Sequence, residues 1–148
     1  NEAEVWQQFL NFIDENQELE IVYSEKIIAD TQSSIAGTID ALYKTNEGKY
    51  ILTDWKRSRK IKITSPSWDV PDYALSPIET YHNTNYWRYV FQLNLYAHIL
   101  SVNGIDVEEL WIVQFHPDNE TYRKHIVPFK QEETRAIIEK YCESCMIL

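Results

Sequence analysis

Apolar residues recur at helical spacing in three parts of the chain. Residues 2–16 carry an amphipathic pattern with acidic residues at its start, which predicts a helix. Residues 85–100 are apolar nearly all round and end near Asn103 and Gly104, which indicates a largely buried helix. We expect a last helix to begin near Gln131.

Five extended runs are rich in β-branched and aromatic residues, and they predict strands at residues 19–28, 35–45, 49–56, 109–115 and 121–129. The expected order is α-β-β-β-α-β-β-α. This order predicts an α/β (α+β) fold in which a central mixed β-sheet is flanked by helices. Residues 63–82 contain three prolines and no clear period, so we expect a functional loop there.

The turn between the second and third strands determines which of their residues face each other. Residues 46–48 resemble a three-residue hairpin loop, with Gly48 at the position that requires a positive φ. A loop of this length places Asp40 opposite Asp54. Lys56 lies two residues beyond Asp54 on the same strand, so the two acids and the amine share one face.

Two carboxylates on a largely apolar sheet repel each other unless a cation or a proton compensates them. Mg²⁺ suits such a site, because it takes one or two carboxylates, keeps several waters and accepts phosphate oxygens. Phosphodiester hydrolysis is then possible: Asp40 and Asp54 hold the ion, and Lys56 orients a water or stabilises developing charge. The alternative is that all three are ordinary polar strand residues, with Lys56 as an ion-pair partner.

Polar residues also form a stripe on the otherwise apolar central helix. Arg88, Gln92 and Tyr96 are spaced four apart and therefore lie on one helix face. Gln92 could hydrogen-bond an active-site lysine, Tyr96 could donate to a phosphate, and Arg88 could pair with a carboxylate or a phosphate. The alternative is a self-contained structural network.

The chain is acidic overall, but many of its basic residues are clustered in one short segment. A formal net charge of -9 argues against a nucleic-acid partner, but five of the 14 Lys and Arg residues fall within residues 56–62. This basic strip directly follows the third strand, where it could bind substrate phosphates. The alternative is a solvated charged loop.

Length and composition set the domain organisation. The chain has 148 residues, of which 44% are hydrophobic, and we expect one domain over residues 1–148. It contains no apolar run long enough for a membrane helix and no signal-peptide pattern at its start, which predicts an intracellular protein without a membrane partner. The first residue is not Met, so we expect a piece of a longer chain.

Taken in order, the motifs resemble those of the RecB-like branch of the PD-(D/E)XK nuclease superfamily, which has a restriction-endonuclease-like core. The matching residues are Glu25, Gly37-Thr38-Ile39-Asp40, Asp54-Trp55-Lys56 and Gln92-Leu93-Asn94-Leu95-Tyr96. The resemblance implies a metal-dependent deoxyribonuclease of the kind that acts in DNA repair, replication and recombination. The catalytic residues it implies are Asp40, Asp54, Lys56, Gln92 and Tyr96.

The resemblance also implies a ligand set for Mg²⁺ or Mn²⁺. Asp40, Asp54 and the backbone carbonyl of Trp55 are the expected ligands. Glu25 either contacts a second metal or fixes a strand edge. The four histidines all follow the Asp54-Trp55-Lys56 motif, so the upstream histidine ligand of many relatives has no counterpart here. With only Cys142 and Cys145, a four-cysteine iron–sulfur cluster cannot be complete within this chain.

The expected substrate is DNA with single-stranded character or duplex ends, and a fused or associated helicase is a further partner suggested by the resemblance. Aromatic residues of the loop and the central helix, such as Trp68, Tyr73, Tyr81 and Trp87, could stack on bases or fill the core. Two rival functions stay open, a catalytically inactive nucleic-acid-binding or scaffolding module and a metal-dependent RNA endonuclease. The residues expected to contact nucleic acid are Arg57, Arg59, Lys60, Lys62, Arg88 and Tyr96.

Overall fold

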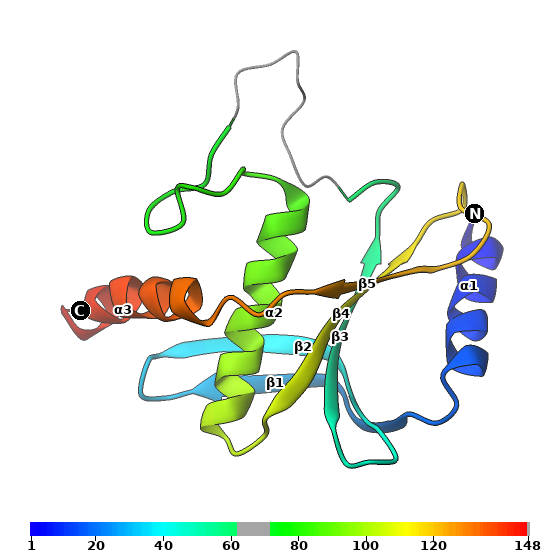
Figure 1. The fold of residues 1–148 in the computed structure, drawn as a ribbon, viewed down its shortest axis with the longest axis horizontal. Helices are drawn as coiled ribbons and strands as arrows, with labels where there is room; N and C mark the ends of the chain where they lie inside the picture. The colour runs from blue at the N-terminus through cyan, green and yellow to red at the C-terminus, as the bar shows by residue number, and fades with distance from the viewer. Residues whose placement is uncertain (62–71, 148) are drawn as a thin grey trace.

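The computed structural model describes residues 1–61 and 72–147, and for residues 142–147 it describes the helix backbone alone. The elements follow the predicted order, so the predicted fold class is confirmed (Figure 1). They are α1 (Glu2–Glu15), β1 (Glu20–Asp30), β2 (Ile35–Lys44), β3 (Tyr50–Arg57), α2 (Asn85–Val102), β4 (Val107–Phe115), β5 (Arg123–Val127) and α3 (Gln131–Ile147).

The five described strands form one mixed sheet in the order β1-β2-β3-β4-β5. Neighbouring strands are antiparallel except for β3 and β4, which run parallel. A parallel pair needs a long crossover connection, and here that connection contains α2. The predicted 46–48 turn is confirmed: Gly48 has a φ of 83°, and the β2–β3 ladder pairs Lys44 with Tyr50 and Ala41 with Thr53.

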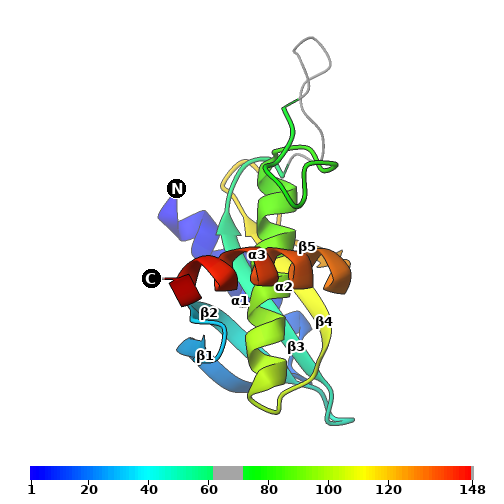
Figure 2. The ribbon, with the colours of Figure 1, turned by 90° about the vertical axis from the view of Figure 1, so that its left-hand side faces the viewer.

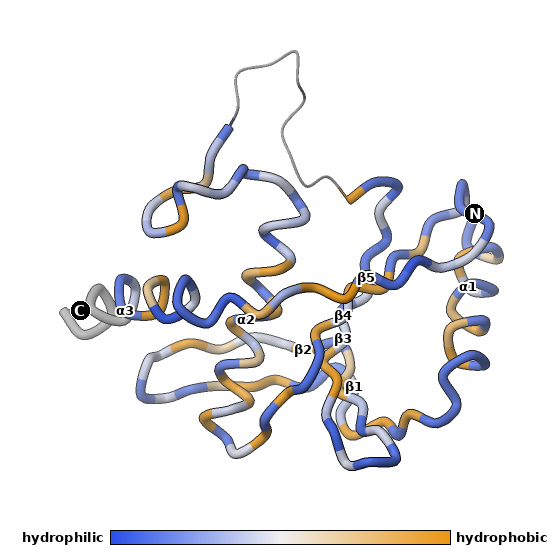
Figure 3. The backbone as a smooth tube through the Cα atoms, in the orientation of Figure 1, coloured by the Kyte–Doolittle hydropathy of each residue, from blue (hydrophilic) through white to orange (hydrophobic). Residues whose placement is uncertain are grey.

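Both faces of the sheet are covered by helices. On one face, α2 packs against a cluster that includes Leu42, Leu52 and Ile112, and α3 packs against α2 (Figure 2). On the opposite face, α1 buries Phe12 against a second cluster that includes Tyr43 and Trp111. Figure 3 shows hydrophobic and hydrophilic segments alternating along α1, as expected for a helix with one face on the sheet.

The aromatic packing under α1 reaches the strand that carries the candidate site. Phe12 is fully buried, and its ring lies 5.2 Å from that of Trp55 in an edge-to-face arrangement. Trp55 lies between Asp54 and Lys56 in the chain, and alternation along β3 places its ring on the α1 face. Packing on one face therefore fixes the backbone that presents the charged residues of β3.

The long connection between β3 and α2 is described at residues 58–61 and 72–84. Tyr73 and His82 form an isolated antiparallel bridge, and Thr84 caps the start of α2. Trp68 and Lys62, for which the sequence predicts roles, lie outside the described residues. In the part of the chain that the structure describes, no helix is long and apolar enough to cross a membrane.

Replacing Phe12 by Ala should cost about 3–5 kcal/mol of unfolding free energy, because it empties a fully buried aromatic site. Leu10→Ala, on the same helix at 40% exposure, is the matched control and should cost less than about 1 kcal/mol. Urea denaturation of the three proteins measures both values. Equal losses in the two variants would show that α1 is not anchored through Phe12.

Candidate metal and phosphodiester site

Strands β2 and β3 separate at the two predicted aspartates. The β2–β3 ladder extends to Ala41 and Thr53, after which β2 continues to pair with β1 and β3 continues to pair with β4. Figure 1 shows the β1–β2 hairpin turning away from β3. The Trp55 N–H donates to Asp40 Oδ2 at 2.8 Å, so a side-chain carboxylate occupies the place of a ladder carbonyl. The carboxyl of Asp40 is thereby held between the diverging strands.

Asp54 lies beside this carboxylate and is only 6% exposed. It is therefore in a low-dielectric environment. Burial and, after it, hydrogen bonding to Asp40 raise the pKa of Asp54 to about 6, while Lys56 acts in the opposite direction. The Lys56 Nζ lies 2.8 Å from Asp54 Oδ2. This contact is an ion pair, yet among the described residues no donor approaches that buried oxygen in hydrogen-bond geometry.

The ammonium of Lys56 is held by three groups that come from two elements. Besides Asp54 on its own strand, α2 supplies the Gln92 Oε1 at 3.3 Å and the ring of Tyr89, whose centroid lies 4.3 Å from Nζ. Gln92 in turn donates from Nε2 to the Tyr96 hydroxyl at 3.1 Å. The structure thus brings Gln92 to Lys56 and joins Tyr96 to Gln92, so these two residues of the predicted stripe lie on one face of α2.

Tyr89 is a site residue that none of the sequence motifs includes. Its contact with Lys56 is a cation–π interaction, with the ammonium over the face of the ring. A sequence signal existed: Tyr89 precedes Gln92 by three residues, so both lie on the same side of α2.

Gly37 has a steric role in the same site. A Cβ built on Gly37 would lie 2.3 Å from Cε1 of Tyr96, far inside van der Waals contact. The Tyr96 ring therefore packs directly on the backbone of β2. This close approach explains why a glycine stands three residues before Asp40.

Glu25 lies on β1 at the position opposite Asp40, since Ser24 pairs with Ala41 and Lys26 pairs with Ile39. Its φ of 50° is unusual for a residue with a side chain. The side chain is exposed, and no group of three His, Cys, Asp or Glu residues in the described chain is arranged to hold a metal. The geometry thus brings Asp40 and Asp54 together without adding Glu25 to them.

The described residues fit a hard cation that keeps most of its own water ligands. Two carboxylates converge, the buried Asp54 Oδ2 has an ion pair but no well-oriented hydrogen bond, and the backbone carbonyl of Trp55 follows directly in the chain. Mg²⁺ binds proteins in this manner, through one or two carboxylates. The donor set contains no thiolate or imidazole, which softer metals prefer.

The basic strip is partly neutralised within the protein. Arg57 pairs with Glu2 at 2.6 Å, and Arg59 pairs with Asp118 at 3.4 Å. All four side chains are more than half exposed, so each pair contributes little and can exchange for a phosphate. Among the described residues no carboxylate pairs with Lys60.

A buried glutamine that the sequence analysis does not single out holds the backbone of this strip. Gln114, 2% exposed on β4, donates from Nε2 to the Ser58 carbonyl at 2.7 Å and to the Arg59 carbonyl at 3.0 Å. Its Oε1 lies 3.0 Å from His125 Nε2. The strip is therefore anchored to the sheet through its main chain, and the side chains of Arg59 and Lys60 lie at the surface.

Arg88 does not reach the carboxylates. Its Nε donates to the Thr84 carbonyl at 3.3 Å, and the residue lines an apolar cavity beside Gln92. Of the other aromatic candidates, Tyr81 packs edge-on against Trp87 and Phe91, with ring centroids 4.7 and 5.1 Å away. Tyr81 therefore serves packing at the start of α2.

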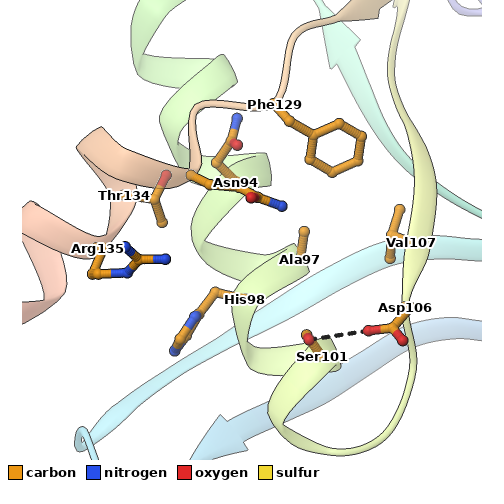
Figure 4. A pocket seen from close by; sticks show the side chains of 10 residues that line it. Asn94, Ala97, His98, Ser101, Asp106, Val107, Phe129, Thr134 and Arg135 are labelled. Carbon is orange, nitrogen blue, oxygen red and sulfur yellow. Dashed lines mark hydrogen bonds between the residues drawn. The ribbon is translucent and has the colours of Figure 1, made fainter.

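A second cavity, of about 460 Å³, lies where α2 meets the start of α3 (Figure 4). His98 and Arg135 border it, and Asp106 accepts a hydrogen bond from Ser101 at 3.1 Å. None of the converging residues of β2 and β3 lines this cavity. The side chains of Cys142 and Cys145, further along α3, lie outside the described part of the structure.

No protein-family model and no curated protein matches the sequence. Solved structures similar to this chain include SSO0001, with a TM-score of 0.44 and 20% identity over 94% of this chain and 55% of that chain. Another, from Eubacterium rectale, is named "Putative exonuclease" and has a TM-score of 0.49 and 11% identity over 99% of this chain and 50% of that chain. The chain spans about half the length of these two structures.

The raised pKa of Asp54 makes the stability of the metal-free protein dependent on pH. Because the native pKa of about 6 exceeds the ordinary 3.8, this group's stabilising contribution is complete below about pH 4 and is lost as the pH rises through 6. The expected loss is roughly 3 kcal/mol, at about 1.4 kcal/mol per pKa unit. About 2 kcal/mol of this loss falls between pH 4.5 and 7.5, and Asp54→Asn should abolish most of it in urea denaturation at these two pH values with EDTA present.

Asp14→Asn, at an exposed position of α1, is the control for this experiment and should keep the pH dependence of the unsubstituted protein. An unchanged pH profile in Asp54→Asn would contradict the burial of Asp54 in charged form.

Gly37→Ala should displace the Tyr96 ring, because the added methyl group would overlap it. We expect a loss of about 1–3 kcal/mol, typical of an overpacked site. In a Tyr96→Ala background the same substitution should cost little, since the overlapping ring is gone. A double-mutant cycle by thermal or urea denaturation measures this coupling, and additive losses would show that Tyr96 does not pack on Gly37.

Proposed function

We propose that this chain is a metal-dependent nuclease of the RecB-like PD-(D/E)XK type that hydrolyses phosphodiester bonds of DNA. The observation that carries the proposal is the convergence of Asp40, Asp54 and Lys56, with Gln92 and Tyr96 linked to the lysine. The motifs of the sequence supply the same five residues independently.

In this proposal Asp40 and Asp54 hold Mg²⁺ or Mn²⁺, with the Trp55 carbonyl as a further ligand. When bound, the ion supplies an acidified water and neutralises charge on the phosphate. Because burial and the nearby Asp40 raise the pKa of Asp54, a bound cation would favour its ionised form. Two carboxylates that repel each other in the apo protein are thus the groups that a cation stabilises.

Lys56 has the catalytic role among the chain's own groups. Its ammonium is fixed beside Asp54 by Gln92 and by the ring of Tyr89, so a cation stands next to the place where a phosphate would meet the carboxylates. There it can orient the attacking water or stabilise charge on the phosphate oxygens. Tyr96 keeps Gln92 in position through its hydroxyl.

The direct test is cleavage of labelled single-stranded DNA, duplex DNA and RNA of one sequence in Mg²⁺ or Mn²⁺. DNA cleavage supports the proposal, and cleavage of RNA alone indicates the RNA endonuclease. Binding without cleavage indicates an inactive nucleic-acid-binding or scaffolding module.

Lys56→Ala should retain metal binding and lose turnover. We expect single-turnover cleavage to fall by about 10² or more, as for the loss of a positioned transition-state donor. Lys56→Gln should not restore cleavage, because the amide carries no charge. Addition of Mg²⁺ should raise the melting temperature of Lys56→Ala but not that of Asp54→Asn, since only the latter lacks a metal ligand.

Lys26→Ala serves as a matched control, because Lys26 also lies over a tyrosine ring, at 5.3 Å from Tyr23, but among the described residues it forms no ion pair with Asp40 or Asp54. It should cleave DNA like the unsubstituted protein. Near wild-type cleavage by Lys56→Ala would overturn the proposed mechanism.

Replacing Arg57, Arg59 and Lys60 by Ala should weaken DNA binding and reduce its dependence on salt. Each lost phosphate contact lowers the slope of log affinity against log salt concentration by about 0.7 to 0.9. Titration at several salt concentrations measures the slope, and cleavage at saturating DNA should change little. An unchanged slope would place the phosphate contacts elsewhere.

A further inference from the structure

An apolar cavity of about 350 Å³ lies next to the carboxylate site. Two turns of α2 form one wall, the start of β2 around Ile35 forms another, and Ala74 and Ile78 close it from the loop that precedes α2. The volume falls within the range of small-molecule sites, roughly 300–1,000 Å³.

Two adjacent stripes of α2 join this cavity to the proposed active site. Trp87, Phe91 and Leu95 are spaced four apart and line the cavity with apolar surface. The neighbouring stripe, one residue later, consists of Arg88, Gln92 and Tyr96, and all three also line the cavity. Gln92 therefore borders the cavity and bonds Lys56 at the same time.

We propose that this cavity receives one unstacked nucleobase of the DNA strand, from a nucleotide next to the cleaved phosphodiester. The inference rests on the proposed function, because it places the phosphodiester at Lys56. It assigns the substrate class more narrowly, as DNA in which at least one nucleotide beside the cleaved bond is unpaired.

The chemistry of the walls matches a nucleotide that enters with its base first. An aromatic and aliphatic lining fits the faces of any base, and stacking of this kind is tolerant of sequence. Arg88 provides the charge for the adjoining phosphate: its Nε is oriented by the Thr84 carbonyl, and no described residue gives its guanidinium a carboxylate partner. A base inside an intact duplex would first have to leave its stack, which costs a few kcal/mol.

The test compares the binding of a 12-nucleotide oligothymidylate with that of an abasic oligonucleotide of the same length. Fluorescence anisotropy is measured in Mg²⁺ on a Lys56→Ala background, so that the DNA is not consumed. Ala74→Trp places an indole in the cavity from the loop side. We expect it to lower the affinity for oligothymidylate about ten-fold or more, the effect of losing one stacked base, and to leave the affinity for the abasic strand unchanged.

Leu75→Trp is the matched control, because Leu75 is the next residue, is 82% exposed and does not line this cavity. It should bind both strands like the background protein. Leu95→Trp fills the cavity from the helix side and keeps the test decisive if Ala74→Trp unfolds, which thermal melting reports.

The outcomes separate this inference from the proposed function. Undiminished oligothymidylate binding by the cavity-filling variants, or no DNA binding at all, overturns the nucleobase site. If the unsubstituted protein nevertheless cleaves DNA, the proposed function stands without that site. If it cleaves no nucleic acid but the filled variants lose oligothymidylate binding selectively, the nucleobase site stands and the proposed function fails.

Discussion

Asp54 is buried beside Asp40, and the electrostatic cost of this placement determines much of the surrounding structure. Burial of a carboxylate with a like charge next to it favours the protonated form, as the pKa of about 6 shows. The Lys56 ammonium offsets part of that cost at 2.8 Å. The charge of Asp54 is partly offset by Lys56, but its Oδ2 has no well-oriented hydrogen bond. Such a buried carboxylate lowers stability when its role is purely structural, and it is favourable in a site that binds a cation.

Helix α1, the sheet and helix α2 each restrain one part of the cluster formed by Asp40, Asp54 and Lys56. The aromatic packing under α1 restrains Trp55 and with it the backbone of β3. The divergence of β2 leaves room for the Asp40 carboxylate, which is fixed by the Trp55 N–H. Helix α2 restrains Lys56 through Gln92 and Tyr89. The site thus depends on four elements, α1, β2, β3 and α2, none of which could place two acids and an amine alone.

The sequence predicts the order of elements, the register of the β2–β3 hairpin and the meeting of Asp40, Asp54 and Lys56, because each depends on local spacing. A turn at residues 46–48 is enough to bring the two strands into register. The contacts of Gln114 with the strip backbone could not be predicted in this way, because they join β4 to a segment more than 50 residues away. The exposure of Glu25 likewise depends on the local φ of β1, which composition does not reveal.

The sides of α2 have different roles, which the composition of the helix does not reveal. An apolar helix with scattered polar residues suggests a core element, and Val90, Leu93 and Ile99 do serve the core. Another side of the helix carries Trp87, Phe91 and Leu95, which line the apolar cavity. The adjacent side carries Gln92, which bonds Lys56. The two stripes are offset by only one residue, so Gln92 both lines the apolar cavity and bonds Lys56 of the charged cluster. In the proposed nuclease this one rigid helix would hold a base and a phosphate at a fixed separation, which flexible loops could achieve only at a greater entropic cost.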